Sequence, residues 1–431
     1  MKRKDFIRTS ALLSAGILTR PFITYAGASK YKVALIGSGW WGTNILRAAV
    51  ASGEVEVVAL CDADENQLLK CEADLKNWCT DSPKKYKHYK ECIQKSKPDI
   101  VINATPDHWH ALIAIEALQA GCHVFLEKPI SHTLKEGTAI QKAARDSGKI
   151  CIVDFHRRYS PHNVSGMDFL KSGKAGNIRE VKAFVNYNWG MGQAAQNIVE
   201  TPAGLDWDLW CGPAEFTDYN PAIHPRGWRQ FRNFANGQLG DWGPHWFDQI
   251  LWWTEEKAPK KVFSTSLANV RPGPQDAPES QLVTFEFESF RCHWEHSTFN
   301  RGPESQTENV GVYFYGDKGT FHMGWKDGWS YYPMNKNETV IHQSASLDMP
   351  DQQNIALVWA DLLQSIKTGK LPHADIENGR QATNMCMLGM VSEKLGRSIN
   401  WNHEKDMVMN DSEANALLMR NYRAGYVYPK S

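Results

Sequence analysis

A lysine, an aspartate and a histidine have the types and spacing that suit proton transfer at a hydroxyl group. Lys128 follows the apolar run 124–126 and precedes a proline, which favours an extended conformation at the lysine. Asp241 and His245 are four residues apart, so they share a face if both lie on one helix. An imidazole titrates near neutrality, and an ammonium group stabilises a developing alkoxide. These residues could oxidise a secondary alcohol, with Lys128 and His245 sharing the proton and Asp241 positioning the substrate or orienting the imidazole.

Such an oxidation needs a hydride acceptor, and a glycine-rich stretch near the N-terminus predicts its site. Gly37, Gly39 and Gly42 follow a β-rich run and precede a helical pattern, with Asp62 about 20 residues further on. This is the full dinucleotide fingerprint, in which the glycines allow a tight turn, approach of a pyrophosphate and close helix packing. Asp62 would bind the adenosine ribose and repel a 2′-phosphate, which favours NAD over NADP. The alternative is that Asp62 caps the next helix, a role that Asp64 can take instead.

Strand-like and helix-like patterns alternate through the first third of the chain. The strand-like runs are residues 31–36, 55–60, 99–105, 122–127 and 150–154, and the helical patterns include 43–52, 106–120 and 133–147. This order implies a parallel, doubly wound α/β sheet with its ligand at the carboxyl ends of the strands. The expected cofactor contacts are Gly37, Ser38, Gly39, Trp40, Trp41, Gly42, Asp62, Asn103, Thr105, Pro106, His108, His110, Glu127 and Lys128.

The second part of the chain has the pattern of an α+β domain with an open, mostly antiparallel sheet. Its strand-like runs are residues 178–189, 262–270, 281–287, 291–297 and 309–315, and helical patterns follow at 353–368 and 379–396. We expect three parts: an export signal over 1–28, a Rossmann NAD-binding domain over 29–155, and a substrate-binding domain with a helical C-terminal tail over 156–431.

The ordered motifs resemble those of the Gfo/Idh/MocA oxidoreductases. The resemblance rests on GSGWWG at 37–42, TPDHWH at 105–110, EKP at 127–129, WDLWCGPA at 207–214 and GDWGPH at 240–245, together with a tail over 395–423. It covers nearly all of the chain after the leader. It implies a Rossmann domain, an open sheet that packs in homo-oligomers, NAD(P), and a polyol or sugar substrate. The family's lysine falls on Lys128, and its Asp-x-x-x-His pair falls on Asp241 and His245.

Further candidates for substrate contact are His156 and Arg157, which follow the fifth predicted strand, and Trp228 and Trp242, because indoles stack on sugar rings. We expect no metal. His108 and His110 lack a third ligand at suitable spacing, and the two histidines within 292–296 would point to opposite faces of a strand.

Composition and the N-terminal leader indicate the protein's partners and its localisation. The formal net charge is zero and no long basic run occurs, which argues against nucleic acid or an anionic membrane as the main partner. Residues 1–28 combine a basic start, a short apolar run and a small-residue end, and resemble a twin-arginine export signal in which a lysine replaces the second arginine. We therefore expect a periplasmic protein with no membrane span after processing. Because free NAD is scarce outside the cytoplasm, the NAD should be tightly held.

Three functions fit these observations. The first is NAD-dependent oxidation of a secondary hydroxyl of a sugar or glycoside. The second is an NAD-dependent glycosidase that oxidises its substrate transiently, eliminates the glycosidic substituent and reduces the product again. The third is a non-catalytic NAD-binding sensor, against which the joint presence of Lys128, Asp241 and His245 argues.

Overall fold

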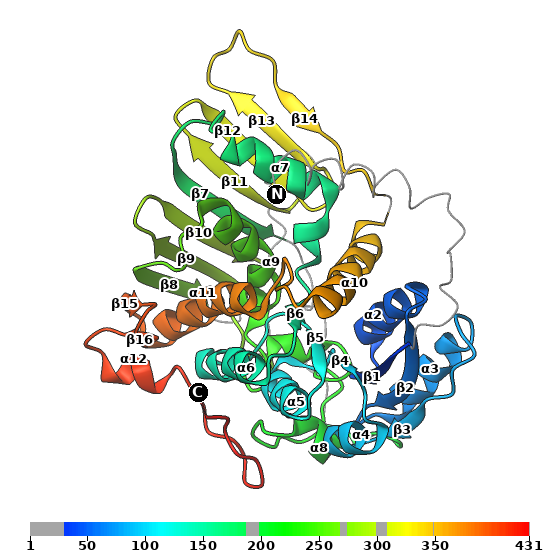
Figure 1. Ribbon diagram of the computed structural model, residues 1–431. Helices are drawn as coiled ribbons and strands as arrows, with labels where there is room; N and C mark the ends of the chain where they lie inside the picture. The colour runs from blue at the N-terminus through cyan, green and yellow to red at the C-terminus, as the bar shows by residue number, and fades with distance from the viewer. Residues whose placement is uncertain (1–29, 187–197, 268–273, 299–307, 348, 431) are drawn as a thin grey trace.

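The computed structural model describes residues 30–186, 198–267, 274–298, 308–347 and 349–430, so the predicted leader lies outside the described residues. Within these residues the N-terminal part forms a six-stranded parallel sheet in the order β3-β2-β1-β4-β5-β6 (Figure 1). The strands are β1 (Tyr31–Ile36), β2 (Val55–Cys61), β3 (Lys84–Tyr86), β4 (Ile100–Asn103), β5 (His123–Leu126) and β6 (Cys151–Val153). The connecting helices are α2 (Trp40–Ala51), α3 (Glu65–Leu75), α4 (Tyr89–Ser96), α5 (Asp107–Gln119) and α6 (Leu134–Ser147).

The predicted doubly wound fold is confirmed. The strand order reverses between β1 and β4, and ligands bind at such a switch point beyond the carboxyl ends of the strands. All four residues of β4 are buried. The first three of them are apolar, as a parallel strand needs when helices cover both faces of its sheet.

The second sheet has ten strands within the described part of the chain, in the order β14-β13-β12-β11-β7-β10-β9-β8-β15-β16. Its strands are β7 (Ile178–Asn186), β8 (Lys261–Leu267), β9 (Ser280–Glu286), β10 (Arg291–Ser297), β11 (Val310–Gly316), β12 (Gly319–Gly324), β13 (Trp329–Pro333), β14 (Ile341–Gln343), β15 (Ile399–Asn402) and β16 (Met407–Val408). All neighbouring pairs are antiparallel except β7 and β10, which run parallel. The open, mostly antiparallel sheet is confirmed, and only this one pair departs from the expected direction.

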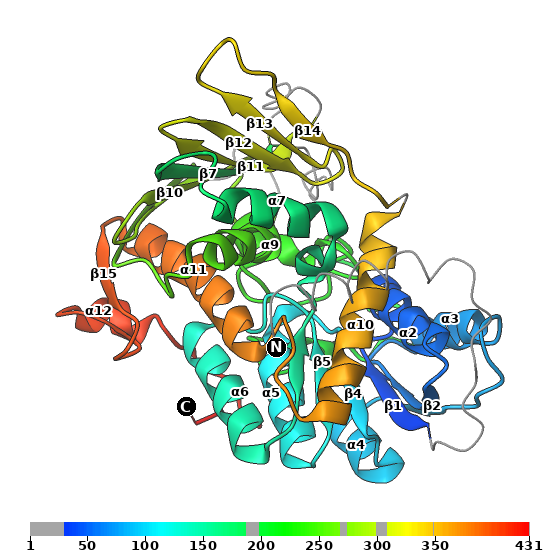
Figure 2. The same ribbon diagram turned by 45° about the horizontal axis from the view of Figure 1, so that its top comes forward.

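Three helices form a layer between the two sheets. They are α7 (Pro161–Lys171), α9 (Gly237–Thr254) and α11 (Ile376–Leu395), and Figure 2 shows them beneath the second sheet and above the first. Helix α9 contacts β7 and β10, α7 contacts β12 and β13, and α11 contacts both α9 and α6. Helix α9 therefore carries its residues along the boundary between the two sheets.

One helix of the second part returns to the nucleotide-binding part. Helix α10 (Pro350–Thr368) contacts α2 and the short 3₁₀ helix η1 (His156–Tyr159), and it lies beside α2 in both views (Figures 1 and 2). Trp359 of α10 stacks on Phe125 of β5 with ring centroids 5.7 Å apart. The two parts thus share one hydrophobic core, and the predicted boundary at residues 155 and 156 remains a prediction.

The predicted strands and helices agree with the structure wherever they fall on described residues. The ends of two expected strands, 187–189 and 268–270, lie outside these residues. Strand β3, helix α4 and the short strands β12 to β16 are not among the elements expected from the sequence. All nine cysteines are described and carry free thiols. In the described ranges, no helix combines the length and apolar character needed to cross a membrane.

Candidate active site

The glycine-rich turn between β1 and α2 has room for a ligand at one glycine and none for a side chain at two others. Gly37 has φ +91°, a left-handed conformation that favours glycine. A Cβ atom on Gly42 would lie 2.0 Å from the carbonyl oxygen of Gly37, so this position requires glycine for close packing of α2. A Cβ atom on Gly39 would meet no atom within 4 Å. The backbone is therefore open on the side where the N-terminus of α2 can bind an anion.

Asp62 follows β2 and its carboxylate is tied to the glycine-rich turn. It accepts hydrogen bonds from the backbone N–H of Ser38 at 2.7 Å and from its hydroxyl at 3.0 Å. Asp64, and not Asp62, caps α3 by accepting from the N–H of Asn66, which removes the alternative role considered above. Burial raises the pKa of Asp62 to about 6, although hydrogen bonds from Asp64 and Ser38 oppose the rise. The turn and this acid together fit a dinucleotide.

The loops after β4 and β5 are fixed by a buried histidine and an asparagine. His110 contacts the carbonyl oxygen of Pro129 through Nδ1 at 2.7 Å and that of Thr105 through Nε2 at 2.8 Å. Asn103 donates to the carbonyl oxygen of His110 at 3.0 Å, and Pro106 is the N-cap of α5. Burial lowers the pKa of His110 to about 4, although the two carbonyl contacts oppose the fall. These contacts hold the two loops together.

The side chain of His108 packs in the aromatic cluster around Trp210. Its Nε2 is 2.9 Å from the carbonyl oxygen of Trp210, and its ring packs on Trp210 and Phe234. The described contacts of His108 and His110 are thus with the protein itself. Their contact with the cofactor remains a prediction.

Lys128 lies at the centre of a small ion cluster. Its Nζ donates to the carbonyl oxygen of Asp241 at 2.9 Å and to Oδ1 of the same residue at 2.8 Å. Arg229 donates to the same Oδ1 at 3.0 Å. Burial would raise the pKa of Asp241, but Lys128 and then Arg229 lower it to about 2. The aspartate is therefore ionised and holds the ammonium group of Lys128, which precedes a cis peptide bond to Pro129.

Asp241 and His245 both lie on α9, so their four-residue spacing puts them on one face of that helix. The His245 ring is buried, and its Nδ1 has no hydrogen-bond partner among the described residues. Trp325 and His156 pack edge-on against it, each with ring centroids 5.1 Å away, and Trp242 lies at 6.0 Å. Burial, followed by the charges of Lys128, His156 and Arg157, lowers the pKa of His245 well below its usual value. His245 is therefore a neutral imidazole with an unused nitrogen.

A buried carboxyl pair lies next to this histidine cluster. Trp41 donates its indole N–H to Oε1 of Glu127 at 2.6 Å and to Oδ2 of Asp154 at 3.1 Å. Burial and the charge of Asp154 raise the pKa of Glu127 well above its usual value, so Glu127 carries the proton of the pair. The Asp154 carboxylate faces His156, which helps to hold its pKa low against the effect of burial.

The remaining substrate candidates fall in two places. Arg157 is buried, with its guanidinium group 4.4 Å from the ring centre of Trp325. Trp242 also packs on Trp325, at 4.8 Å between ring centroids, so it lies beside His245. Trp228 belongs to a different aromatic cluster and reaches the site through Arg229, whose guanidinium group lies 4.1 Å from its ring centre.

Comparison with known proteins gives two consecutive family matches. A family described as "Oxidoreductase family, NAD-binding Rossmann fold" matches residues 31–155, and its companion, "Oxidoreductase family, C-terminal alpha/beta domain", matches residues 176–428. The second match alone spans more than half of the chain. The chain belongs to the Gfo/Idh/MocA family. As a Gfo/Idh/MocA protein it belongs to an oxidoreductase family, and its NAD-binding Rossmann domain is confirmed.

Curated relatives of this Gfo/Idh/MocA protein have several activities in their names. It is 26% identical over 219 residues to the putative oxidoreductase YteT of Bacillus subtilis (strain 168), covering 51% of this chain and 44% of that protein. It is 29% identical over 189 residues to a glycosyl hydrolase family 109 protein of Stenotrophomonas maltophilia (strain K279a), covering 42% of each. It is 28% identical over 155 residues to D-glucoside 3-dehydrogenase of Escherichia coli (strain K12), covering 35% and 42%. The chain thus spans less than half the length of these relatives.

Solved structures share the fold over most of this chain. Levoglucosan dehydrogenase in complex with NADH and levoglucosan has a TM-score of 0.67 and 16% identity, covering 86% of this chain and 99% of that one. Aldose-aldose oxidoreductase from Caulobacter crescentus, complexed with glycerol, has a TM-score of 0.65 and 17% identity, covering 86% and 100%.

The cluster around Lys128 and His245 also contains residues that are not among the candidates from the sequence. They are Asp154, Arg229, Trp325 and Asp351. Asp154 ends a predicted strand, so the rule that ligands bind at strand ends could have found it. The other three come from a short 3₁₀ helix, the end of β12 and the first turn of α10, and their nearest sequence neighbours give no signal.

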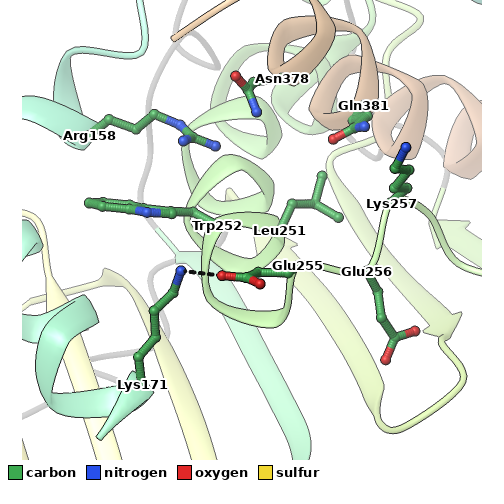
Figure 3. Close-up of a pocket in the computed structure, with 9 residues that line it drawn as sticks. All are labelled: Arg158, Lys171, Leu251, Trp252, Glu255, Glu256, Lys257, Asn378 and Gln381. Atoms are coloured by element: carbon green, nitrogen blue, oxygen red, sulfur yellow. Dashed lines mark hydrogen bonds and ion pairs between the residues drawn. The ribbon is translucent and has the colours of Figure 1, made fainter. Parts of the chain in front are cut away.

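Two further regions lie outside this cluster. A cavity of about 220 Å³ opens at the C-terminal end of α9, lined by Arg158, Lys171, Leu251, Trp252, Glu255, Glu256, Lys257, Asn378 and Gln381 (Figure 3). Its lining includes the Lys171–Glu255 ion pair, and Arg158 is held there by Asp248.

No group of three His, Cys, Asp or Glu side chains suited to a metal ion occurs in the part of the chain that the structure describes.

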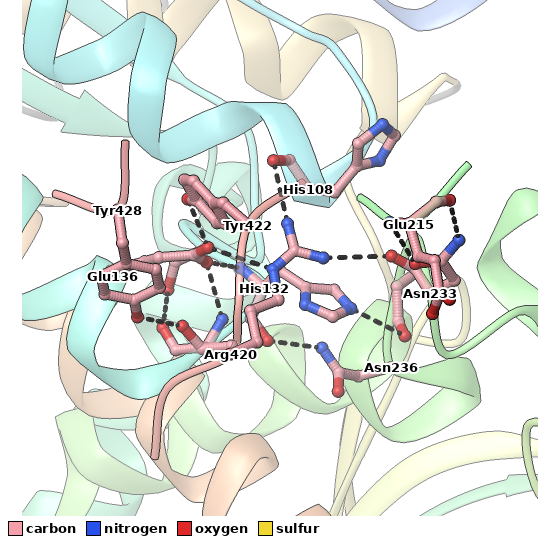
Figure 4. A network of polar contacts seen from close by, with 12 residues as sticks. His108, His132, Glu136, Glu215, Asn233, Asn236, Arg420, Tyr422 and Tyr428 are labelled. Carbon is pink, nitrogen blue, oxygen red and sulfur yellow. Dashed lines mark hydrogen bonds and ion pairs between the residues drawn. The ribbon is translucent and has the colours of Figure 1, made fainter. Parts of the chain in front are cut away.

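The C-terminal arm crosses from the second part of the chain to the loops beside the site (Figure 4). Arg420 donates to the carbonyl oxygen of Asn233 at 3.1 Å and to that of His108 at 3.3 Å. Tyr422 donates to the fully buried carboxylate of Glu136 at 2.6 Å. Because Glu136 also caps α6 and accepts from the N–H of His132, the arm fixes the start of α6 to the chain that precedes α9.

Proposed function

We propose that this protein oxidises a secondary hydroxyl group of a sugar or glycoside by hydride transfer to NAD. The observation that carries the proposal is the convergence of Lys128, Asp241 and His245 at the carboxyl ends of the Rossmann strands, beside a glycine-rich turn that fits a dinucleotide. The names of relatives support the substrate class, since one is a D-glucoside 3-dehydrogenase.

The protein's own residues divide the proton chemistry between them. Bound NAD supplies the acceptor for the hydride that leaves the substrate carbon. His245 is neutral, so it accepts the hydroxyl proton on its ring as the C–O bond becomes a carbonyl. The ammonium group of Lys128, held by Asp241, stabilises the developing alkoxide. Asp241 therefore acts on the substrate by orienting Lys128.

Aromatic side chains support a carbohydrate as the substrate. Trp242 and Trp325 pack together beside His245, and Trp242 is only partly buried. Indole faces bind the apolar faces of sugar rings while leaving the hydroxyl groups to polar partners. A pyranose seated on this pair would present its hydroxyl groups to His245 and Lys128.

A second candidate function is redox-assisted cleavage of a glycosidic bond. It is favoured by the relatives named as glycosyl hydrolase family 109 proteins, one of which is 29% identical to this chain over 189 residues. In this reaction the first oxidation is the same, and the ketone then acidifies the neighbouring C–H bond for elimination. Release of the aglycone without net NADH would select this reaction, whereas stoichiometric ketosugar would select dehydrogenation. A protein that binds NAD but oxidises no sugar would be a sensor.

Export, tight retention of NAD and assembly into a homo-oligomer complete the proposal. Residues 1–28 support export by their resemblance to a twin-arginine signal. A periplasmic enzyme would need to retain its NAD, which mass spectrometry of the purified protein would detect.

The central experiment replaces Lys128 by methionine, which keeps the length of the side chain without its charge. We expect NAD to remain bound, as measured by mass spectrometry, and turnover on a sugar and glycoside panel to fall about a hundred- to ten-thousand-fold. The matched control is Lys142→Met, because Lys142 pairs with Asp146 on the exposed face of α6. Undiminished turnover by folded K128M would contradict the proposal.

A further inference from the structure

His156 lies between two carboxylates that come from distant parts of the chain. Its Nδ1 is 3.6 Å from Oδ1 of Asp154, at the end of β6, and its Nε2 is 3.6 Å from Oδ1 of Asp351, in the first turn of α10. The imidazole is 3% exposed. Neither ring nitrogen, nor either of the two facing oxygens, has a hydrogen-bond partner among the described residues.

These four unsatisfied atoms define the protonation state that the geometry suits. A neutral imidazole carries one N–H and can satisfy only one of the two carboxylates. An imidazolium carries an N–H on each nitrogen and can face both, and burial without a partner is costly for polar atoms. Asp154 is fixed on its other side by the indole N–H of Trp41 at 3.1 Å. A protonated His156 would thus connect the end of β6 and α10 through Asp154 and Asp351, and Asp154 extends the connection to α2 through Trp41.

The same ring lies beside the proposed base. The ring centroids of His156 and His245 are 5.1 Å apart in an edge-on arrangement, and Trp325 packs against both rings. The nitrogens of His156 face the two carboxylates, so it is placed to act on His245 through its charge and not by accepting its proton. The other charged groups that act on His245 are Lys128 and Arg157.

We propose that His156 is a positioning residue whose positive charge links Asp154 to Asp351 and keeps His245 in its neutral, proton-accepting form. The proposal rests on the proposed role of His245 as the base. It adds that α10 is anchored to the site by Asp351, and that the protonation of one histidine controls that of the other.

The charges around the two rings support this assignment. Burial lowers the pKa of His156, but Asp154 and Asp351 more than compensate, so the pKa is raised above its usual value. The Asp351 side chain is 40% exposed, so it connects the buried cation to solvent. Glu127, the other acid close by, carries the proton of its pair with Asp154 and adds no charge. At a separation near 5 Å, a unit charge shifts a neighbouring pKa by about one to two units.

The experiment titrates the two histidines by NMR and measures activity separately. In the folded wild-type protein with NAD bound, we expect His156 to titrate above pH 6.5 and His245 far below it. In His156→Gln the pKa of His245 should rise by about one to two units. The acid limb of the pH profile of kcat/KM should move to higher pH by the same amount. His156→Arg, which keeps the charge, should leave that limb near its wild-type position.

Controls keep the two proposals separable. His342→Gln removes an exposed imidazole of β14 and should leave the titration of His245 unchanged. Asp351→Asn should lower the pKa of His156 even if His156→Gln does not fold. An unchanged His245 titration in folded H156Q, or a wild-type His156 that titrates below pH 6, would overturn the inference. If the NMR shifts appear while no sugar is oxidised, the proposed function fails and the electrostatic link stands.

Discussion

Replacing Asp241 by asparagine tests whether charge holds the cluster of Lys128, Asp241 and Arg229. The carboxylate oxygen of Asp241 accepts from Lys128 at 2.8 Å and from Arg229 at 3.0 Å, and its side chain is 13% exposed. Burial opposes ionisation, yet the two cations lower the pKa of Asp241 from 3.8 to about 2. Asparagine keeps the shape of the side chain and one acceptor oxygen but removes the charge.

The expected magnitude follows from this pKa. At about 1.4 kcal/mol per unit, the lowering corresponds to about 2.5 kcal/mol in favour of the ionised, folded state. The asparagine variant also leaves two cations without a counter-charge, which is the costly way to break a buried ion pair. We therefore expect the free energy of unfolding to fall by about 2–4 kcal/mol at neutral pH. Because the folded pKa lies below the unfolded one, this contribution is complete above about pH 4 and is lost as the pH falls toward about 2.

The assay is urea unfolding of the wild-type protein and the variant, followed by tryptophan fluorescence, at several pH values between about 7 and 3. The difference between the two proteins should stay constant down to about pH 5 and narrow below about pH 4. Asp146→Asn is the control, since it removes an exposed carboxylate paired with Lys142 and should cost less than about 1 kcal/mol. A difference no larger than that of the control, or one that widens in acid, would refute the reasoning.

Two other substitutions test the glycine-rich turn and the C-terminal arm. Gly42→Ala would place a Cβ atom 2.0 Å from the carbonyl oxygen of Gly37, so it should lower both the melting temperature and the affinity for NAD. The Cβ atom of Gly39→Ala would meet no atom within 4 Å, so this variant should lower only the affinity for NAD. Thermal unfolding and a fluorescence titration with NAD distinguish these outcomes, and an unchanged melting temperature for G42A would contradict the packing argument. Tyr422→Phe removes a hydrogen bond to the buried carboxylate of Glu136 and should cost about 1–3 kcal/mol of unfolding free energy. The control is Tyr332→Phe, on β13. If Tyr422→Phe lowers the unfolding free energy no more than this control does, the C-terminal arm contributes little through Tyr422.

The fold was largely readable from the sequence because its main elements carry a strong hydrophobic period. The runs at 31–36 and 99–105 are apolar enough to be buried on both faces, and they form the central strands of the first sheet. Strand β3 was missed because two of its three residues are exposed lysines, which leaves no apolar pattern. The parallel pairing of β7 and β10 could not be predicted either, since the period of a strand shows its faces but not its neighbours.

Site residues could be predicted where a strand end coincides with a motif. They were missed where they come from another part of the sequence. Lys128 follows a strand end, and Asp241 and His245 both lie on α9, which meets the condition under which their four-residue spacing puts them on one face. Arg229 and Asp351 have no such marker. They act on residues about 12 and 195 positions away, so only the packing of α9 and α10 brings them in.

The charges of the site are ordered so that Lys128, Arg229 and a protonated His156 each face an anion and His245 remains neutral. Lys128 and Arg229 share Asp241, and a protonated His156 would lie between Asp154 and Asp351. These acids and bases then have partners that stabilise their charged forms, so they do not readily accept another proton. His245 is surrounded by cations and indole rings and stays neutral, which leaves it as the group able to receive the proton of an alcohol. The neighbouring cations make the protonated form of His245 unfavourable. They therefore also favour release of the proton that His245 has accepted, which a base must achieve at each turnover.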